Sequence, residues 1–497
     1  MPKHLFCMLC ACVLSLSLLL TSCGNLTELT TSSDTARGSV VMDDVTTASF
    51  PITFMAGIQA TVEIEAGDIF AAASYAVTQY NLVYYTIDAK KNVTKASAKL
   101  LIPGNSTDLD LVVYLHGTTS LDADAPTNTN VDFSYYDGVD PNTIDHNIAD
   151  MPETAMLMSY VSDSGIAVLM PDYLGFGASE GLHPYMHGDS LASATIDAIR
   201  AALTFANHSS NTFSLTGDFT LTGYSEGGYA VMATHKELLA DDGFVESAYL
   251  DIMGDSEGSK LKAVIPGAPP CNISQRMAKV MVELEFIGST PNPYPAPAFA
   301  AYVALAYNEI YDIEANISTI FSPTYTYIID DFDGSKSLTT MTGEFLAGDI
   351  FPPTPISMFS TEFQTAILAD YATISGDYTA TPVDEFYQKF KENDVFDYNP
   401  GNAYYEIIYT ASDEIVPSIN ATEAAEALGV YGRSVNYDKY DNMGASLSPG
   451  QINLFQDPND TLYVGAKSGD PSLLIHSSAA GFYIGKSFIV SKTLLSL

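Results

Sequence analysis

Residues 223–227 read Gly-Tyr-Ser-Glu-Gly and place a serine two positions from a glycine on either side. Before them, Phe219–Thr222 alternate bulky and β-branched side chains and predict a short buried strand, whereas Tyr229–Leu239 predict a helix. A serine in a sharp turn from strand to helix can be a nucleophile, because its Oγ stands at a helix N-terminus that favours negative charge. Side chains at the two glycine positions would collide with the strand or the helix. We therefore predict that Ser225 is a nucleophile; the alternative is a glycine-rich turn whose serine only caps the helix.

A serine hydroxyl needs a general base near neutral pH. In hydrolases with this kind of turn, the chain order is Ser, then Asp or Glu, then His. Of the eight histidines, only His235 and His476 follow Ser225. His235 lies ten residues further along the same predicted helix, roughly 15 Å of helical rise away. By elimination His476 is the candidate base, which we place in a loop after the last predicted strand; the alternative is a surface histidine.

The third member of such a site is a carboxylate that orients the imidazole and stabilises its protonated form. Asp413 is the first acidic residue after the strand predicted at Tyr404–Ala411. The carboxyl ends of parallel strands are where sites in open α/β sheets collect. Asp413 is therefore the candidate acid. Glu414 is its close rival, and a solvated acidic loop without a catalytic role is the alternative to both.

Two backbone N–H groups are expected to stabilise the negative oxygen that forms when a hydroxyl attacks a carbonyl. Glu226 follows the nucleophile and is expected to supply one of them. Thr118, which follows His116-Gly117 after the strand predicted at Leu109–Leu115, is expected to supply the other. Asp172 and the segment His183-Pro184-Tyr185 are expected to support the walls of the pocket.

The charge balance excludes several classes of partner. The chain has 20 Lys and Arg against 60 Asp and Glu, so its formal charge of −40 disfavours nucleic acid and anionic lipid surfaces.

A Cys/His zinc pattern, a Walker loop and a dinucleotide fingerprint are absent. Asp331-Phe-Asp333-Gly334 resembles part of a calcium loop, but the remaining ligand spacing is not met. We expect neither a metal nor a cofactor at the site.

The first residues predict export. Residues 1–22 combine a positive Lys3 with an apolar run and are expected to be a signal peptide. Leu20-Thr-Ser-Cys23 resembles the lipobox of bacterial lipoproteins, which predicts that a lipid on Cys23 anchors the chain to a cell-envelope membrane; the alternative is an ordinary secretory signal and a secreted protein. Residues 23–49 are Thr/Ser-rich and predict a flexible tether. In the mature chain Cys271 has no partner except Cys23, so we expect no internal disulfide and a buried thiol.

Buried strands alternate with amphipathic helices and predict an α/β fold, in which a mostly parallel sheet has helices on both faces. The expected first part of this core spans residues 50–267, and the second part spans residues 401–497. Residues 268–400 interrupt the pattern with prolines and aromatic-rich helical stretches and predict an inserted, mainly helical cap. A last strand is expected within Gln451–Val464 and a terminal helix at Gly481–Leu495.

Together, these motifs resemble the α/β-hydrolase superfamily over nearly all of the mature chain. Pro171-Asp-Tyr-Leu-Gly175, Gly223-Tyr-Ser-Glu-Gly-Gly228 and the long insertion further resemble the secretory lipase family. That resemblance implies the α/β-hydrolase fold, a lid over an acyl pocket and no cofactor. Secretory lipases usually carry disulfides, and in this respect the chain departs from the family.

Three functional hypotheses follow. The first is a serine hydrolase that cleaves small-molecule or lipid carboxylic esters through an acyl-enzyme on Ser225. The second is a peptidase of the prolyl-oligopeptidase type, which a carboxylate in the cap, placed to hold a peptide amine, would favour. The third is a non-catalytic lipoprotein that keeps the fold for binding. No feature of the sequence specifies an oligomeric state.

Overall fold

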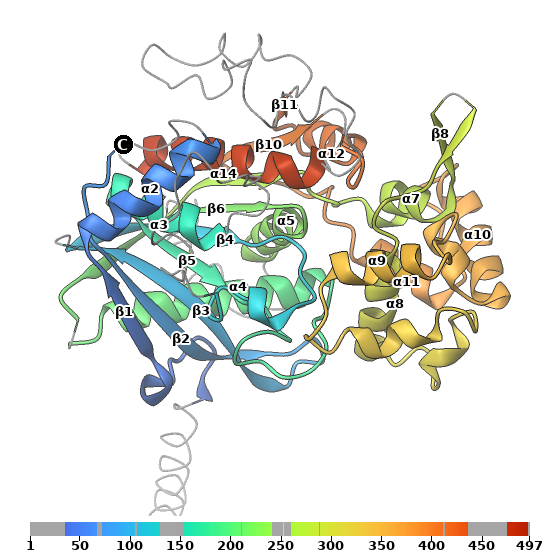
Figure 1. Ribbon diagram of the computed structural model, residues 1–497, viewed down its shortest axis with the longest axis horizontal. Helices are drawn as coiled ribbons and strands as arrows, with labels where there is room; N and C mark the ends of the chain where they lie inside the picture. The colour runs from blue at the N-terminus through green and yellow to red at the C-terminus, as the bar shows by residue number, and fades with distance from the viewer. Residues whose placement is uncertain are drawn as a thin grey trace, which may run out of the picture.

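The computed structural model describes residues 35–66, 72–104, 107–129, 153–209, 211–240, 252, 260–287, 289–410, 413–435 and 475–495. A nine-stranded sheet with the order β1-β2-β3-β5-β4-β6-β7-β10-β11 forms its centre (Figure 1). The strands are β1 (Thr46–Phe50), β2 (Val77–Ile87), β3 (Val93–Pro103), β4 (Asp108–Leu115), β5 (Ala167–Pro171), β6 (Ser214–Tyr224), β7 (Leu261–Gly267), β10 (Tyr404–Thr410) and β11 (Tyr431–Val435).

The sheet is parallel from β5 to β11 and antiparallel only at its N-terminal side. The pairs β4–β5, β4–β6, β6–β7, β7–β10 and β10–β11 are parallel. The pairs β1–β2, β2–β3 and β3–β5 are antiparallel. The carboxyl ends of β4, β6, β7 and β10 consequently meet at one edge, and Leu115 pairs there with Gly223.

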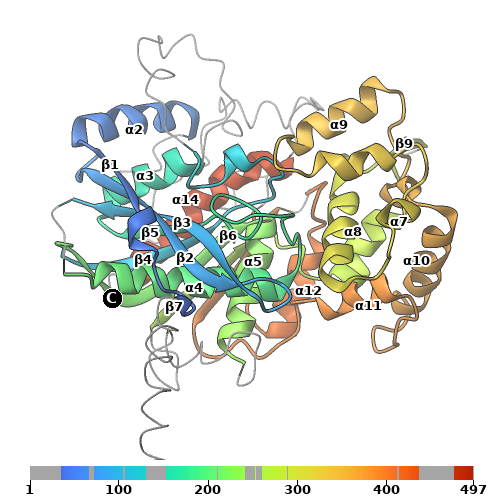
Figure 2. The ribbon, with the colours of Figure 1, turned by 90° about the horizontal axis from the view of Figure 1, so that it is seen from below.

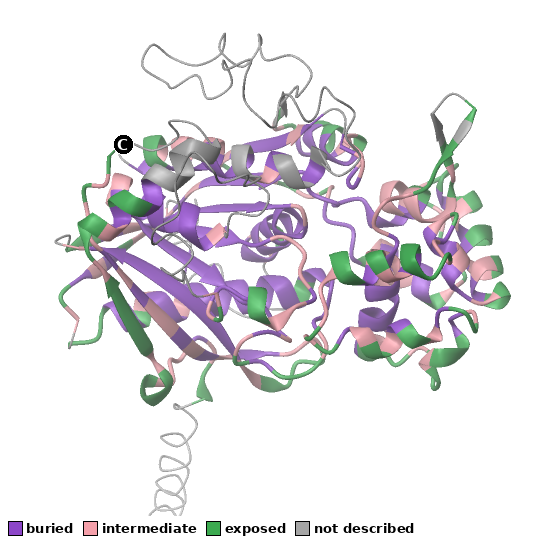
Figure 3. Cartoon of the chain, viewed as in Figure 1, coloured by how far each residue is buried: buried purple, intermediate pink, exposed green. Residues whose placement is uncertain are grey.

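Helices cover both faces of this sheet, as Figure 2 shows. On one face, α4 (Gly188–Ala206), α5 (Glu226–Leu238) and α12 (Ile419–Leu428) pack their apolar residues into the larger core. On the other face, α2 (Ile52–Ala66), α3 (Glu153–Ser164) and α14 (Ile475–Leu495) contribute to a second core. The central strands are buried on both sides (Figure 3), and their continuous apolar runs are the pattern that parallel strands require. The prediction of a mostly parallel sheet with helices on both faces is confirmed.

A mainly helical insertion lies between β7 and β10, to the right of the sheet in Figure 1. Its aromatic side chains extend the larger core, because Tyr302, Tyr307 and Phe345 are almost completely buried within it. Its elements are the π-helix η6 (Ile273–Met277), α7 (Ala278–Val282), the hairpin β8 (Glu285–Ile287) and β9 (Thr290–Asn292), α8 (Ala298–Tyr311), α9 (Leu338–Ala347), α10 (Thr361–Ile374), α11 (Glu385–Glu392), and the 3₁₀ turns η7 (Ile317–Thr319), η8 (Thr326–Asp331) and η9 (Pro355–Met358). Elsewhere, short 3₁₀ turns lie at η2 (Met42–Asp44) and η3 (Asp122–Asp124).

The predicted tether of residues 23–49 needs a correction, because its described part already contacts the sheet. The backbone N–H of Gly38 donates to Tyr85 at 2.7 Å, and β1 pairs with β2 from Thr46 onward. Arg37 forms an ion pair with the buried Asp197 of α4 at 2.9 Å. The apolar pattern of β1 is absent because it is an exposed edge strand, held by backbone hydrogen bonds on one side.

Several other predictions fall on residues outside the described ranges. These are the signal peptide at residues 1–22, the proposed lipidation site Cys23, and the strand expected within Gln451–Val464. None of the helices inside the described ranges is long and apolar enough to cross a bilayer.

Candidate active site

Ser225 occupies a strained turn between the end of β6 and the start of α5. Its φ of 60° and ψ of −121° lie outside the regions that side chains ordinarily allow. The glycines around it are needed for close backbone approach. A Cβ on Gly227 would lie 1.9 Å from the carbonyl oxygen of Leu115, and one on Gly223 would lie 2.6 Å from the same oxygen. The sharp turn predicted from the sequence is therefore present, and its glycines are there for the expected steric reason.

Three side chains that are far apart in sequence meet at this turn. Nε2 of His476 lies 2.8 Å from Oγ of Ser225, and Nδ1 lies 2.7 Å from Oδ2 of Asp413. A carboxylate only accepts hydrogen bonds, so Nδ1 carries a proton and Nε2 is left to accept the serine proton. The other oxygen of Asp413 accepts from the backbone N–H groups of Ile415 and Val416 at 3.0 and 2.7 Å. These bonds fix the direction of the carboxylate.

The two candidate acids contact different parts of His476. Asp413 contacts the imidazole, whereas Oε1 of Glu414 accepts the backbone N–H of His476 at 3.2 Å. Burial raises the pKa of the Glu414 carboxyl above its ordinary value. Glu414 is thus placed to hold the backbone of the histidine, and Asp413 to orient its ring.

The prediction that His476 lies in a loop is wrong. It is the second residue of α14, a helix that packs across the sheet against β6 and β7. The carbonyl oxygen of His476 accepts from the hydroxyl of Tyr224 at 2.9 Å, and the two rings lie 5.0 Å apart. The N–H groups of a first helical turn have no partner within the helix, which is why Glu414 can bind one of them.

A second contact from α14 was not predicted from the sequence. The hydroxyl of Tyr483 accepts from the backbone N–H of Gly223 at 2.8 Å and donates to the carbonyl oxygen of Ile265. Its ring lies where a Cβ on Gly267 would be, at 2.4 Å. Helix α14, which carries His476, is therefore hydrogen-bonded directly to β6, the strand that ends just before Ser225.

The two predicted oxyanion donors are next to Ser225 in the chain or next to a residue that approaches it. Glu226 is the first residue of α5, and its side chain contacts His183. Thr118 follows Gly117, whose backbone comes close enough that a Cβ there would lie 3.8 Å from Cβ of Ser225. The hydroxyl of Thr118 lies 3.2 Å from the hydroxyl of Tyr185. The backbone at Gly117 and the start of α5 therefore both lie close to Ser225, and the role of Thr118 and Glu226 as donors stays a prediction.

Two buried side chains, His116 and Asp172, form hydrogen bonds to this loop. His116 is buried, with its ring nitrogens 2.8 Å from the carbonyl oxygen of Gly117 and 3.3 Å from that of Asp172. The carboxylate of Asp172 accepts from the backbone N–H of Thr127 at 2.8 Å and from the hydroxyl of Ser97 at 2.6 Å. These contacts hold the loop that carries Thr118.

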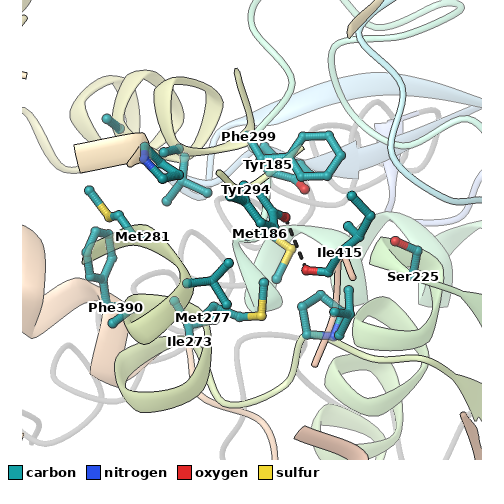
Figure 4. A pocket seen from close by; sticks show the side chains of 18 residues that line it. Tyr185, Met186, Ser225, Ile273, Met277, Met281, Tyr294, Phe299, Phe390 and Ile415 are labelled. Atoms are coloured by element: carbon teal, nitrogen blue, oxygen red, sulfur yellow. Dashed lines mark hydrogen bonds between the residues drawn. The ribbon is translucent and has the colours of Figure 1, made fainter. Parts of the chain in front are cut away.

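An apolar pocket extends from Ser225 into the insertion (Figure 4). Met281 and Phe390 lie at the end of the pocket away from Ser225, as the close-up shows. The hydroxyl of Tyr294 points at the carbonyl oxygen of Ile415, to which it donates at 3.1 Å. The lining residues are Tyr185, Met186, Ser225, Pro270, Ile273, Met277, Ala278, Val280, Met281, Tyr294, Phe299, Ala300, Val303, Ala304, Pro355, Phe390, Ile415 and Val416.

Cys271 is not among the described residues that line the pocket. Cys271 is a free, fully buried thiol, and burial raises its pKa, which keeps it protonated. Within the described ranges, no group of three or more His, Cys, Asp or Glu residues is placed to hold a metal ion.

A model of the secretory lipase family matches residues 147–238, which include the turn at Ser225. A putative hydrolase from Legionella pneumophila is 21% identical, with a TM-score of 0.65 over 92% of this chain and 98% of that one. The ligand-bound rice cell wall degrading esterase LipA from Xanthomonas oryzae is 22% identical, with a TM-score of 0.63 over 93% and 99%. No curated protein matches the sequence.

The chain has the α/β-hydrolase fold and resembles the secretory lipases. The two solved structures, both under 25% identical, share the fold of this chain, and residues 147–238 resemble the secretory lipase family. Both agree with what the motifs of the sequence implied.

The steric role of the glycines at this turn predicts that Gly227→Ala disrupts it. A methyl group 1.9 Å from a backbone oxygen forces the backbone to move, so we expect a loss of more than about 3 kcal/mol in the free energy of unfolding. Gly343→Ala in α9 is the matched control, because nothing lies within 4 Å of its added Cβ. There the free energy of unfolding is expected to rise by up to about 1 kcal/mol. Denaturant unfolding measures both, and equal effects would contradict the steric argument.

Proposed function

We propose that this protein is a serine hydrolase that cleaves carboxylic esters through an acyl-enzyme on Ser225. The observation that carries the proposal is the chain of contacts from Ser225 through His476 to Asp413, at 2.8 and 2.7 Å, beside an apolar pocket. Nucleophilic catalysis needs a nucleophile, a base within reach of it and a group that orients the base. Here these are the strained serine at a helix N-terminus, the histidine and the carboxylate.

In the proposed reaction, Nε2 of His476 takes the proton of Ser225 as its Oγ bonds to the ester carbonyl carbon. The N–H groups of Glu226 and Thr118 stabilise the negative oxygen. Asp413 stabilises the imidazolium. The tetrahedral intermediate then breaks its bond to the alcohol, which leaves with the proton from His476. A water molecule, deprotonated by His476, then bonds to the acyl carbon, and the second tetrahedral intermediate breaks its bond to Ser225. The carboxylic acid leaves, and Oγ of Ser225 takes the proton back from His476.

The pocket favours an ester over a peptide substrate. None of the described residues that line it is charged, so the lining holds no carboxylate to bind a peptide amine. The resemblance to secretory lipases agrees with this preference, as does the description of LipA from Xanthomonas oryzae as an esterase. A small-molecule or lipid ester with an apolar acyl chain is the proposed substrate class, and the prolyl-oligopeptidase alternative has no matching feature in the pocket.

The division of roles between the two acidic residues gives a direct test. Asp413→Asn is expected to lower kcat for a short acyl ester by about 10⁴-fold, because the ring of His476 loses the partner that sets its proton position. Glu414→Gln keeps an oxygen that can accept the backbone N–H of His476 and leaves the contact between Asp413 and the ring in place, so we expect it to lose less than about tenfold.

Steady-state kinetics with purified variants measures both values, and thermal unfolding confirms that both fold. Full activity in Asp413→Asn would reject it as the acid. A wild-type protein without turnover on any ester would favour the non-catalytic alternative.

The depth of the pocket predicts the acyl-chain preference. Met281 lies at the far end, so Met281→Ala lengthens the space available to a chain. We expect the maximum of kcat/KM over a series of acyl esters to move to longer chains. Met341→Ala is the matched control, because Met341 is buried in α9 and does not line the pocket. An unchanged profile in Met281→Ala would show that the acyl chain does not occupy this pocket.

We further propose that the protein is exported and anchored through a lipid on Cys23. The family resemblance supports export, and the lipobox at residues 20–23 supports the anchor. Growth with labelled palmitate is expected to label the wild type and the control Cys271→Ser, but not Cys23→Ser. An unlabelled wild type in the medium would instead indicate a secreted protein.

A further inference from the structure

A buried pair of ionisable side chains, His183 and Glu226, lies directly behind the nucleophile. Nε2 of His183 is 2.8 Å from Oε1 of Glu226, and each side chain is 1% exposed. Glu226 follows Ser225 and opens α5, so the carboxyl group sits beside the backbone N–H that is proposed to contact the reacting oxygen. The catalytic mechanism described above does not use this carboxyl group.

Hydrogen-bond geometry determines the proton count of the pair. Nδ1 of His183 lies 2.7 Å from the carbonyl oxygen of Leu174, which can only accept, so Nδ1 carries a proton. A second proton must lie between Nε2 and Oε1, because two acceptors 2.8 Å apart would repel each other. The pair is then either imidazolium with carboxylate or imidazole with carboxylic acid. In both arrangements its net charge is zero.

The surroundings make that neutrality necessary. Oε2 of Glu226 is buried and has no hydrogen-bond partner among the residues that the structure describes. The ring of His183 packs against aromatic rings, with centroid distances of 4.8 Å to Phe176, 5.8 Å to Tyr173 and 5.9 Å to Tyr302. Because both side chains are only 1% exposed, an unbalanced charge here is costly. The aromatic faces favour a cation on His183, and the N-terminus of α5 favours an anion on Glu226.

We propose that His183 is a positioning residue for the reaction. It balances the charge of Glu226, so that the backbone N–H of Glu226 contacts the negative oxygen next to a pair of side chains with no net charge. The proposal rests on the proposed function. Without His183, a buried carboxylate would lie next to the oxygen that becomes negative in the transition state. It would oppose the charge that the N–H groups are there to stabilise, whereas binding of the uncharged ester would change little.

Four variants test this charge balance at pH 8. They are His183→Gln, Glu226→Gln, the double variant, and His235→Gln as the matched control. His235 is buried, as His183 is, and lies on α5, as Glu226 does. It contacts Tyr398 and not the turn at Ser225. The measurements are kcat and KM for a short acyl ester, together with the free energy of unfolding.

We expect His183→Gln to lower kcat by about 100-fold with KM changed less than about threefold, which is the scale of losing one oxyanion donor. Glu226→Gln removes the charge and keeps a donor for Nε2, so its kcat should stay within about tenfold of wild type. The double variant should recover at least about tenfold over His183→Gln, because neither residue is then charged. The control should keep wild-type kinetics.

A packing role would give a different result. The two single losses would then multiply in the double variant, and a double variant no faster than His183→Gln overturns the proposal. A wild type without ester turnover would refute the proposed function instead. In that case the free energies of unfolding decide, because charge balance still requires the double variant to be more stable than His183→Gln, and the opposite order rejects it.

Discussion

The turn between β6 and α5 is the steric constraint on which the rest of the site depends. The backbone at Ser225 takes a φ of 60°, and carbonyl oxygens of neighbouring segments come so close that only glycine fits at 223 and 227. Such strain persists only when the surroundings fix it. Here they do so from two sides, with β4 against the glycines and Tyr483 on the N–H of Gly223.

Helix α14 brings the candidate base to the strained serine. His476 lies 251 positions after Ser225, and its contact with the hydroxyl depends on where the helix is fastened. The hydroxyl of Tyr483 hydrogen-bonds to the backbone of β6 and β7. The hydroxyl of Tyr224 donates to the carbonyl oxygen of His476, and Glu414 accepts from the N–H of His476. Tyr224, a neighbour of Ser225, and Glu414, a neighbour of Asp413, therefore fix the backbone of His476. Asp413 has only to set the rotation and tautomer of the ring.

The sequence predicted those parts of the site that follow from local geometry. The glycines around Ser225 report a steric need, and Asp413 follows a buried strand whose end must lie at the common edge of a parallel sheet. The sequence predicts the terminal helix only from Gly481, whereas α14 begins at Ile475 and includes His476. The contact between Glu414 and the N–H of His476 joins residues 62 positions apart, and no periodic pattern records such a contact. For the same reason the pairing of His183 with Glu226 could not be predicted: each residue alone resembles an ordinary loop or helix residue.

The central claim, that Ser225 is an activated nucleophile, is tested most directly by a fluorophosphonate probe that bonds to reactive serine hydroxyls. Intact mass and peptide mapping after reaction measure how many probes attach and where. The account predicts one probe per chain, on Ser225, and no labelling of Ser225→Ala. A folded wild-type protein that stays unlabelled, or that is labelled at another residue, would contradict it.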